Sequence, residues 1–327
     1  MPRTALALSI LLITSVTTSA FAQPRPPTID DVVRRLGLSE AAAARAKNGE
    51  VVAEDLESTS DKDLALAVVV RINAPPKTVY EFVKADKLAK FQTVTIAVGP
   101  IDPSNPSLAG MTLSDDTLKK LAQDPGGTFY MSDEEATRVA EAGKLGTTKA
   151  FAAYQDVLVA RAKAYWEQGL NGITAYAGKG RSPAVDLAHA NEAGKALLRS
   201  PETWAELDTV PAKHSGKATH QLFWAVQKSR DQAAPVLIHR VLFRTPGAEI
   251  FLERRFYSAY DYDALQILTG VLPTSSGDSA VFYTNHTYTA QVTGFGGSAK
   301  RSIGRKLLAK DLVAEMQRAQ HVARAGG

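Results

Sequence analysis

The stretch SAVFYTNHTYTAQV, residues 279–292, decides the fold class, because it is the longest segment that alternates with a period of two. Its more apolar face carries Ala280, Phe282, Thr284, His286, Tyr288, Ala290 and Val292. A turn at residues 294–297 follows, and residues 302–323 then have the spacing of an amphipathic helix. The helix stripe consists of Leu308, Leu312, Met316 and Ala319. A long strand that leads into a long helix predicts a sheet packed on a C-terminal helix.

Strands are also predicted on both sides of a central helical block. Residues 218–226, 236–244 and 249–256 have strand patterns, whereas residues 261–272 fit a short helix or a strand equally well. Near the N-terminus, residues 64–73 and 93–101 are predicted strands with a helix between them, and two short helices precede them at residues 28–36 and 39–48. Residues 112–208 lack two-residue alternation and contain several helix starts. The chain is therefore expected to be α+β, with a curved antiparallel sheet gripping a long C-terminal helix and a large helical insertion.

One segment resembles the opening of START-like (SRPBCC, helix-grip) domains. It is Val68-Val-Val-Arg-Ile-Asn-Ala74-Pro75, which leads into a helix with Val79 and Phe82. Residues 256–262 and 294–304 are similar to a family of uncharacterised secreted bacterial proteins. The resemblance implies a pocket for a hydrophobic ligand between the sheet and the C-terminal helix. The expected organisation is a signal peptide (1–22), an N-terminal helical segment (23–59), a first START-like part (60–111), the helical insertion (112–210) and a second START-like part (211–327) with the C-terminal helix.

The first 22 residues have the features of a secretory signal peptide. Arg3 precedes an apolar run at residues 5–16, and the small residues Ala20 and Ala22 fit a cleavage site. We therefore expect a soluble periplasmic or secreted protein after cleavage near Ala22; an uncleaved N-terminal anchor is the alternative. The absence of cysteine excludes disulfides and thiolate chemistry, so the exported protein would depend on packing of its core.

Three predicted strands each place one polar residue on an apolar face. These residues are His220, Arg254 and His286, and they are candidates to orient a ligand in a cavity. The full set of predicted ligand-lining residues is His220, Trp224, Arg254, Phe282, Thr284, His286 and Tyr288. The alternative is that each histidine is a satisfied core residue. Arg254 is expected either to bind the carboxylate headgroup of a lipid-like ligand or to pair with an acid of the helical block.

An enzyme is the second hypothesis. No nucleophile elbow, zinc-protease or nucleotide-binding motif is present, so a hydrolase or cyclase-like reaction would use His286 as a general base, with Tyr288 or Arg254 stabilising an anion. His189 and Glu192 stand one helical turn apart, but no third metal ligand is evident, and a solvated helix face is the favoured interpretation. No cofactor is expected.

The net charge of +4 hides an uneven distribution. Residues 212–327 hold 15 basic and 8 acidic residues, a net of +7, whereas residues 23–211 hold 22 and 26, a net of −4. Lys300, Arg301, Arg305 and Lys306 cluster near the start of the last helix and suggest peripheral membrane contact. A non-catalytic cell-envelope interaction protein is therefore a third hypothesis. A nucleic-acid partner is not expected, because secretion and the absence of a stacking platform argue against one.

Overall fold

The computed structural model describes residues 28–84, 94–178, 180–229, 232–245 and 247–324. The predicted signal peptide lies outside these residues. The centre of the molecule is an eight-stranded sheet with the order β1-β2-β8-β7-β6-β5-β4-β3, in which all neighbouring strands are antiparallel. The strands are β1 (Val52–Asp55), β2 (Asp63–Ile72), β3 (Thr95–Ile101), β4 (Thr219–Ser229), β5 (Gln232–Thr245), β6 (Ala248–Ser258), β7 (Ala264–Pro273) and β8 (Ser279–Tyr288).

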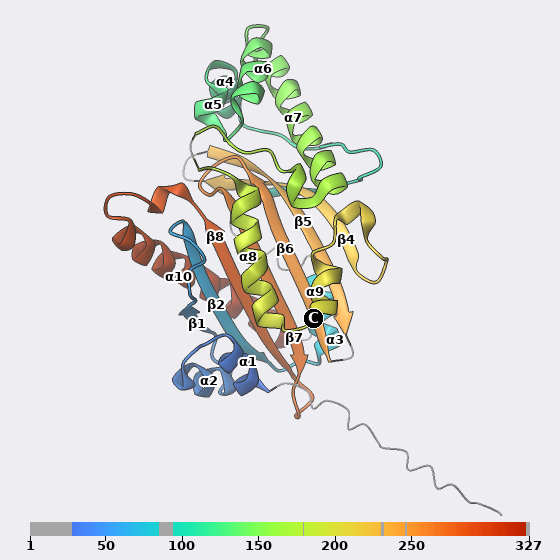
Figure 1. Cartoon of the computed structure of the whole chain (residues 1–327), viewed down its shortest axis with the longest axis vertical. Helices are drawn as coiled ribbons and strands as arrows, with labels where there is room; N and C mark the ends of the chain where they lie inside the picture. The colour runs from blue at the N-terminus through green and yellow to red at the C-terminus, as the bar shows by residue number, and fades with distance from the viewer. Residues whose placement is uncertain (1–27, 85–93, 179, 230–231, 246, 325–327) are drawn as a thin grey trace, which may run out of the picture.

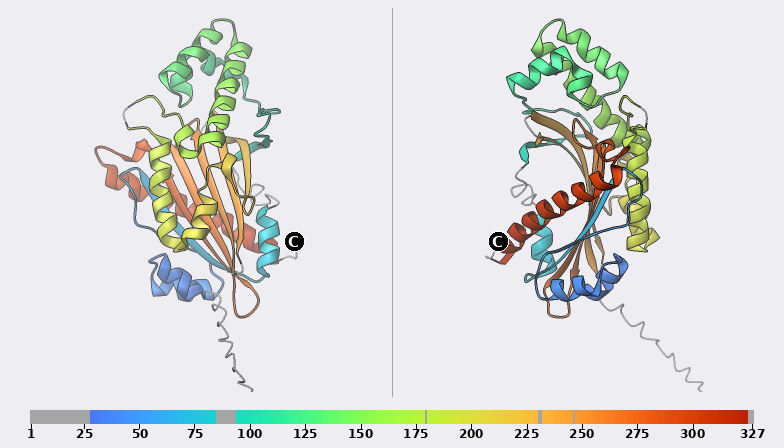
Figure 2. Two further views of the ribbon diagram at one scale, coloured as in Figure 1. Left: turned by 45° about the vertical axis from the view of Figure 1, so that its right-hand side comes forward. Right: turned by 90° about the vertical axis from the view of Figure 1, so that its left-hand side faces the viewer.

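Helices cover both faces of this sheet (Figures 1 and 2). On the face that we call the front lie α1 (Ile29–Arg35), α2 (Glu40–Lys47), α8 (Pro183–Leu198) and α9 (Pro201–Leu207). On the back lie α3 (Pro76–Lys84) and the long α10 (Gly297–Arg324). At one end of the sheet lie α4 (Asp115–Gln123), α5 (Pro125–Thr128), α6 (Asp133–Gly143) and α7 (Thr147–Gln168). Short 3-10 turns occupy residues 169–172, 211–213 and 290–292.

Strand β2 is apolar on both sides because helices cover both of its faces. Leu66 and Val68 pack toward α10 at the back, where Leu312 and Met316 meet them. Ala67 and Val69 point the opposite way, into the cluster formed with α1 and α2. A strand buried on two faces needs no polar alternation, which accounts for the continuous apolar run that the sequence shows there.

The predicted fold class is confirmed: the chain is α+β, with a curved antiparallel sheet, a long C-terminal helix and a large helical insertion. The helix α10 lies mainly against the β1–β2 edge of the sheet and not across its middle. Most of the undecided segment 261–272 belongs to strand β7, and β1 was not predicted. Strand β8 ends at Tyr288, since the Thr289 side chain caps the 3-10 turn that follows.

Candidate ligand-binding site

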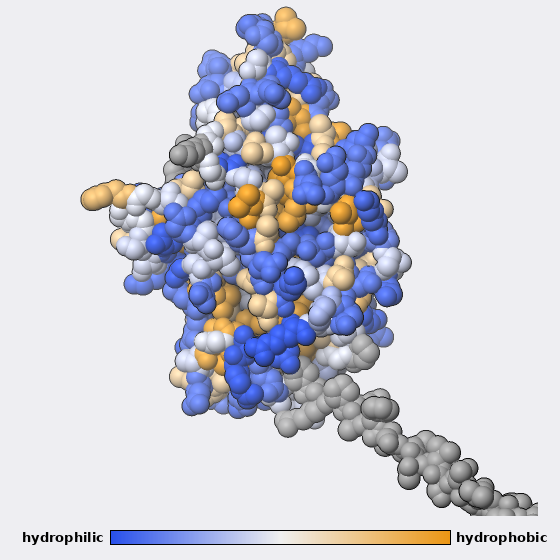
Figure 3. All heavy atoms as spheres, in the orientation of Figure 1, coloured by the Kyte–Doolittle hydropathy of each residue, from blue (hydrophilic) through white to orange (hydrophobic). Residues whose placement is uncertain are grey.

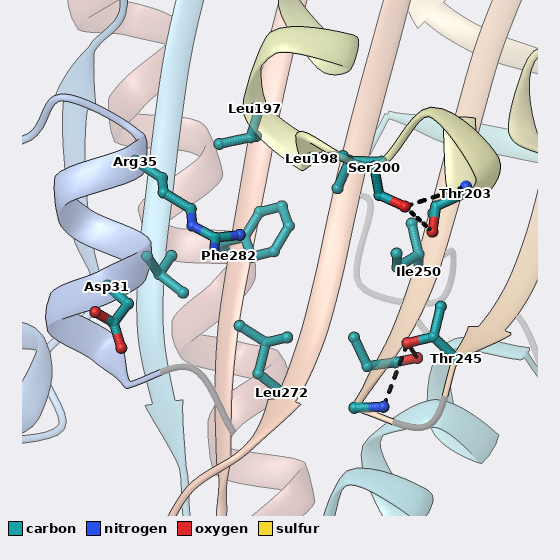
Figure 4. A pocket seen from close by; sticks show the side chains of 13 residues that line it. Asp31, Arg35, Leu197, Leu198, Ser200, Thr203, Thr245, Ile250, Leu272 and Phe282 are labelled. Atoms are coloured by element: carbon teal, nitrogen blue, oxygen red, sulfur yellow. Dashed lines mark hydrogen bonds between the residues drawn. The ribbon is translucent and has the colours of Figure 1, made fainter. Parts of the chain in front are cut away.

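A groove of about 610 Å³ lies on the front of the sheet, between α1 and the C-terminal end of α8. We call it the α1–α8 groove. Its lining is mostly apolar and comes from α1, from the end of α8 and the start of α9, and from strands β5, β6, β7 and β8 (Figure 4). The lining residues are Asp31, Val32, Arg35, Leu197, Leu198, Ser200, Thr203, Thr245, Gly247, Ala248, Ile250, Leu272 and Phe282. This volume is within the range of small-molecule sites, about 300–1,000 Å³.

Phe282 forms part of the floor because the neighbouring strand has no side chain beneath its ring. Gly270 of β7 pairs directly with Phe282 of β8. A Cβ atom built on Gly270 would lie only 2.0 Å from the Phe282 ring. Because Gly270 has no side chain, the Phe282 ring packs directly over the backbone of β7 and forms a flat apolar base for the groove.

Arg35 is the one charged side chain of the α1–α8 groove that has no partner among the described residues. Asp31, the acidic lining residue, accepts hydrogen bonds from the backbone N and the hydroxyl of Thr28, both at 2.8 Å, in the capping box of α1. Ser200 bonds Thr203 at the start of α9. Figure 4 shows Arg35 extending from α1 toward Phe282. Its guanidinium can therefore meet an anionic group of a molecule held in the groove.

A smaller compartment of about 280 Å³ adjoins the groove, and Arg35 and Leu197 line both spaces. We call it the His286 pocket, since His286 and Thr284 of β8 lie at its base. Its other lining residues are Leu36, Leu56, Glu57, Ala193, Gly194, Ala196 and Arg199. His286 is 5% exposed, so its ring contacts this pocket and little else outside the core.

A hydrogen-bond chain behind His286 orients its ring. His286 Nδ1 lies 2.9 Å from Asp63 Oδ2, and the same oxygen accepts from the backbone N and the hydroxyl of Thr59, each at 2.9 Å. Because the Thr59 hydroxyl donates to Asp63, the Tyr288 hydroxyl, 2.6 Å away, donates to Thr59. Burial raises the pKa of Tyr288 far above its usual value, so this phenol stays protonated. Because a carboxylate oxygen accepts, this contact favours the tautomer with the proton on Nδ1, in which Nε2 carries the lone pair.

Helix α8 is held on the sheet by buried ion pairs near its start. Near its start, Lys62 Nζ lies 2.7 Å from Asp186 Oδ2, and Arg181 binds Asp263 at 2.7 Å. Burial raises the pKa of Asp186, and the hydrogen bond from Lys62 opposes this effect. Charges that are almost fully buried need such partners. These contacts therefore fix the start of α8 against the sheet.

Arg254 holds α8 and α9 against the middle of the sheet. It donates to Asp208 at 2.6 Å, to Asn191 at 2.8 Å and to Gln266 at 3.0 Å, and it is 2% exposed. Of the two expectations for this residue, pairing with an acid of the helical block is therefore confirmed, since Asp208 follows α9 directly. The nearby polar groups already occupy its guanidinium.

His220 and Trp224 lie where the sheet packs against the helical block. The His220 ring stacks between those of His214 and His239, and its Nδ1 lies 3.1 Å from His239 Nε2. The other nitrogen of His239 lies 2.8 Å from the hydroxyl of Tyr165 on α7. Trp224 is buried with its ring over Gly99 of β3. Neither His220 nor Trp224 lines the groove or the His286 pocket.

The structure thus separates the seven predicted lining residues. It brings Phe282, Thr284 and His286 together at the two front compartments, while Tyr288 is fully buried behind Asp63 and Thr59. The expected position of this set beneath the C-terminal helix is wrong. Successive side chains of a strand point to opposite faces of the sheet. Val281 therefore packs with α10 at the back, whereas Phe282, Thr284 and His286 point to the front.

Sequence reasoning missed Arg35, Asp63 and the end of α8. The start of α1 was predicted from the Thr28 capping box, but no local signal places this helix against α8, which is distant in the chain. Among the residues that the structure describes, no group of three or more histidine, aspartate or glutamate side chains could hold a metal ion. In the same part of the chain no helix is long and apolar enough to span a membrane.

Comparisons with known proteins identified no relative of this chain. No protein-family model matches the chain, and neither the curated proteins nor the solved structures contain a match.

Proposed function

We propose that this chain is a binding or carrier protein for an apolar, lipid-like ligand with an acidic group, held in the α1–α8 groove. The observation that carries the proposal is an apolar groove of about 610 Å³ whose lining includes Arg35, a cation with no partner among the described residues. An alkyl chain would lie over Phe282, Leu272 and Ile250, and its carboxylate would meet Arg35. Figure 3 shows apolar surface between α8 and α1 bordered by hydrophilic side chains.

The proposed compartment is the periplasm or the extracellular space, after removal of the leader near Ala22. The support is the basic residue, short apolar run and small residues of the first 22 positions. A START-like relationship is also part of the proposal. It rests on the curved antiparallel sheet with its long C-terminal helix, although the proposed groove lies on the opposite face from α10.

The test is binding of a long-chain alkyl carboxylate and of its methyl ester, measured by calorimetry. Arg35→Gln should weaken binding of the carboxylate about 10-fold or more, since a hydrogen bond to a charged group contributes about 1.5–3 kcal/mol, and it should leave the ester unaffected. Arg138→Gln on α6 is the control, because the Arg138 side chain is 55% exposed, pairs with Asp156 and does not line the groove.

A second variant tests the location. Leu197 lines both compartments, so Leu197→Trp should fill them and abolish binding. Val185→Trp, at a position of the same helix that is 53% exposed, should bind as the unmodified protein does. Failure of the unmodified protein to bind either ligand would overturn the proposal.

A second candidate function, a hydrolase, is favoured by one specific observation: His286 bonds a buried carboxylate and faces a pocket. In this reaction His286 Nε2 takes a proton from a water molecule whose oxygen attacks the carbonyl carbon of an ester. The bond from that carbon to the alcohol oxygen then breaks, and the alcohol leaves with the proton from His286. Arg35 would stand beside the developing negative charge.

Its test uses p-nitrophenyl esters of increasing acyl length. Hydrolysis should increase with chain length and fall at least about 100-fold in His286→Gln, the size usual for a general base. His189→Gln is the control, since that histidine is exposed on α8. Hydrolysis equal to the uncatalysed rate, with ligand binding retained, would leave the carrier function and exclude the enzyme.

A further inference from the structure

The first half of α10 and the loop before it present an outward surface that the sheet does not use. Phe295 is 102% exposed, and Ile303 and Leu307 are each 60% exposed. Ile303 and Leu307 are four residues apart and so lie on the same side of the helix. The opposite side packs on the sheet through Leu312 and Met316. We call the outward surface, with the lysines described next, the α10 face.

Three lysines accompany these apolar residues. Lys300, Lys306 and Lys310 are exposed, and among the described residues none of them has an ion-pair partner. No aspartate or glutamate occurs between residues 279 and 310, so the α10 face is purely cationic as far as Asp311. The macrodipole disfavours cations at the start of a helix, so α10 itself does not stabilise these charges.

The arginines of the same segment are turned inward. Arg301 donates to the backbone carbonyl of Asp61 at 2.9 Å, and Arg305 bonds Asp55 at 3.3 Å and also Ser58. Of the four residues that the sequence suggested for membrane contact, Lys300 and Lys306 are therefore the exposed ones, and Arg301 and Arg305 fasten α10 to the loop between β1 and β2.

We propose that the α10 face docks this protein on the surface of an anionic phospholipid bilayer. The combination of large exposed apolar side chains with exposed lysines on one helix face is the chemistry of an interfacial helix, with the apolar groups among the acyl chains and the lysines at the headgroups. The loop that carries Phe295 projects from the edge of the molecule in Figure 1, and an apolar tip projects there in Figure 3. A projecting tip can enter the bilayer while the sheet stays outside it. The proposal does not depend on the ligand groove.

The test is co-sedimentation with vesicles, using the chain from Gln23, which retains every described residue. Vesicles of phosphatidylglycerol and phosphatidylcholine should bind the protein, and pure phosphatidylcholine should not. Each lysine near an anionic surface contributes about 1 kcal/mol, so Lys300→Gln/Lys306→Gln/Lys310→Gln should bind on the order of 100-fold more weakly. The control is Lys120→Gln/Lys149→Gln/Lys163→Gln, in which three exposed lysines of α4 and α7 are replaced.

A second variant tests insertion of the apolar residues. Phe295→Ser/Ile303→Ser/Leu307→Ser should lose binding at 0.5 M salt, where screening leaves mainly the apolar contribution. The control is Leu145→Ser/Val185→Ser, at two other exposed apolar positions. All replaced side chains are exposed, so each variant should keep the circular dichroism spectrum of the unmodified protein. Absence of binding to anionic vesicles, or binding that the lysine or serine replacements leave unchanged, would overturn the proposal.

Discussion

His286 Nδ1 lies 2.9 Å from Asp63 Oδ2, although the two residues are 223 positions apart in the chain. They come from the neighbouring strands β8 and β2, where Ala65 pairs with His286 and Asp63 pairs with Tyr288. The pairing register puts both side chains on the front of the sheet, one step apart along the strands. This contact links β2, the first long strand, to β8, the last strand, and it orients the histidine at the base of the His286 pocket.

Asp63→Ala should lower the free energy of unfolding by about 2–4 kcal/mol, because His286 Nδ1 and the Thr59 amide would be left without their shared acceptor. Urea denaturation followed by circular dichroism measures the change. Asp61→Ala is the control, since this side chain is exposed two positions earlier. Equal stability of the two variants would show that Asp63 does not organise this region.

Arg254→Met should cost about 3–5 kcal/mol, since it leaves Asp208 without its buried cation. The control is Arg244→Met on β5, where the arginine side chain is 57% exposed and pairs with Glu249. A surface pair of this kind contributes little, so no measurable change is expected there. If Arg254→Met unfolds at the same urea concentration as the unmodified protein, the arginine does not hold α8 and α9 on the sheet.

Gly270→Ala should cost about 1–3 kcal/mol, because the added methyl group would overlap the Phe282 ring. The double variant Gly270→Ala/Phe282→Ala should be no less stable than Phe282→Ala alone, since removal of the ring removes the overlap. Gly247→Ala is the control, as no atom lies within 4 Å of its added Cβ. Additive costs in the double variant would contradict the packing of the ring over Gly270.

The stability of the protein should fall as the pH decreases from about 6.5 to about 4. Burial, reinforced by His214 and Arg254, lowers the pKa of His220 to about 4, and burial lowers the pKa of His239 well below its usual value. In this range the unfolded chain binds protons that the folded chain excludes, so acid favours unfolding. Each of the two histidines should lower the free energy of unfolding by at most about 1.4 kcal/mol for every pH unit of acidification.

The measurement is the free energy of unfolding in urea at pH 7, 6, 5 and 4. His220→Asn should flatten the dependence, because it removes one of the two protons that the fold excludes. His189→Gln should leave the slope unchanged, since that histidine is exposed. A slope that His220→Asn does not alter would assign the pH dependence to other groups.

Much of the candidate site could not be predicted from local patterns. The alternation along β8 correctly grouped Phe282, Thr284 and His286 on one face, and an inward Arg254 was correctly expected to need an acid. No sequence pattern around Arg35 indicates a binding site, because this residue lines the groove only when α1 packs beside α8. The role of Gly270 could not be predicted either, because it depends on the pairing of this residue with Phe282 on the neighbouring strand.

The sequence by itself determined the α+β class and most of the strands and helices, because periodicity, capping residues and prolines act over a few residues. Only the tertiary structure decided which helices cover which face. Strand β2, next to the edge of the sheet, is apolar on both sides, so the pattern cannot distinguish the face under α10 from the face under α1 and α2. That choice depends on contacts between distant segments, such as Lys62 with Asp186 and Arg254 with Asp208, and it moves the groove to the front of the sheet.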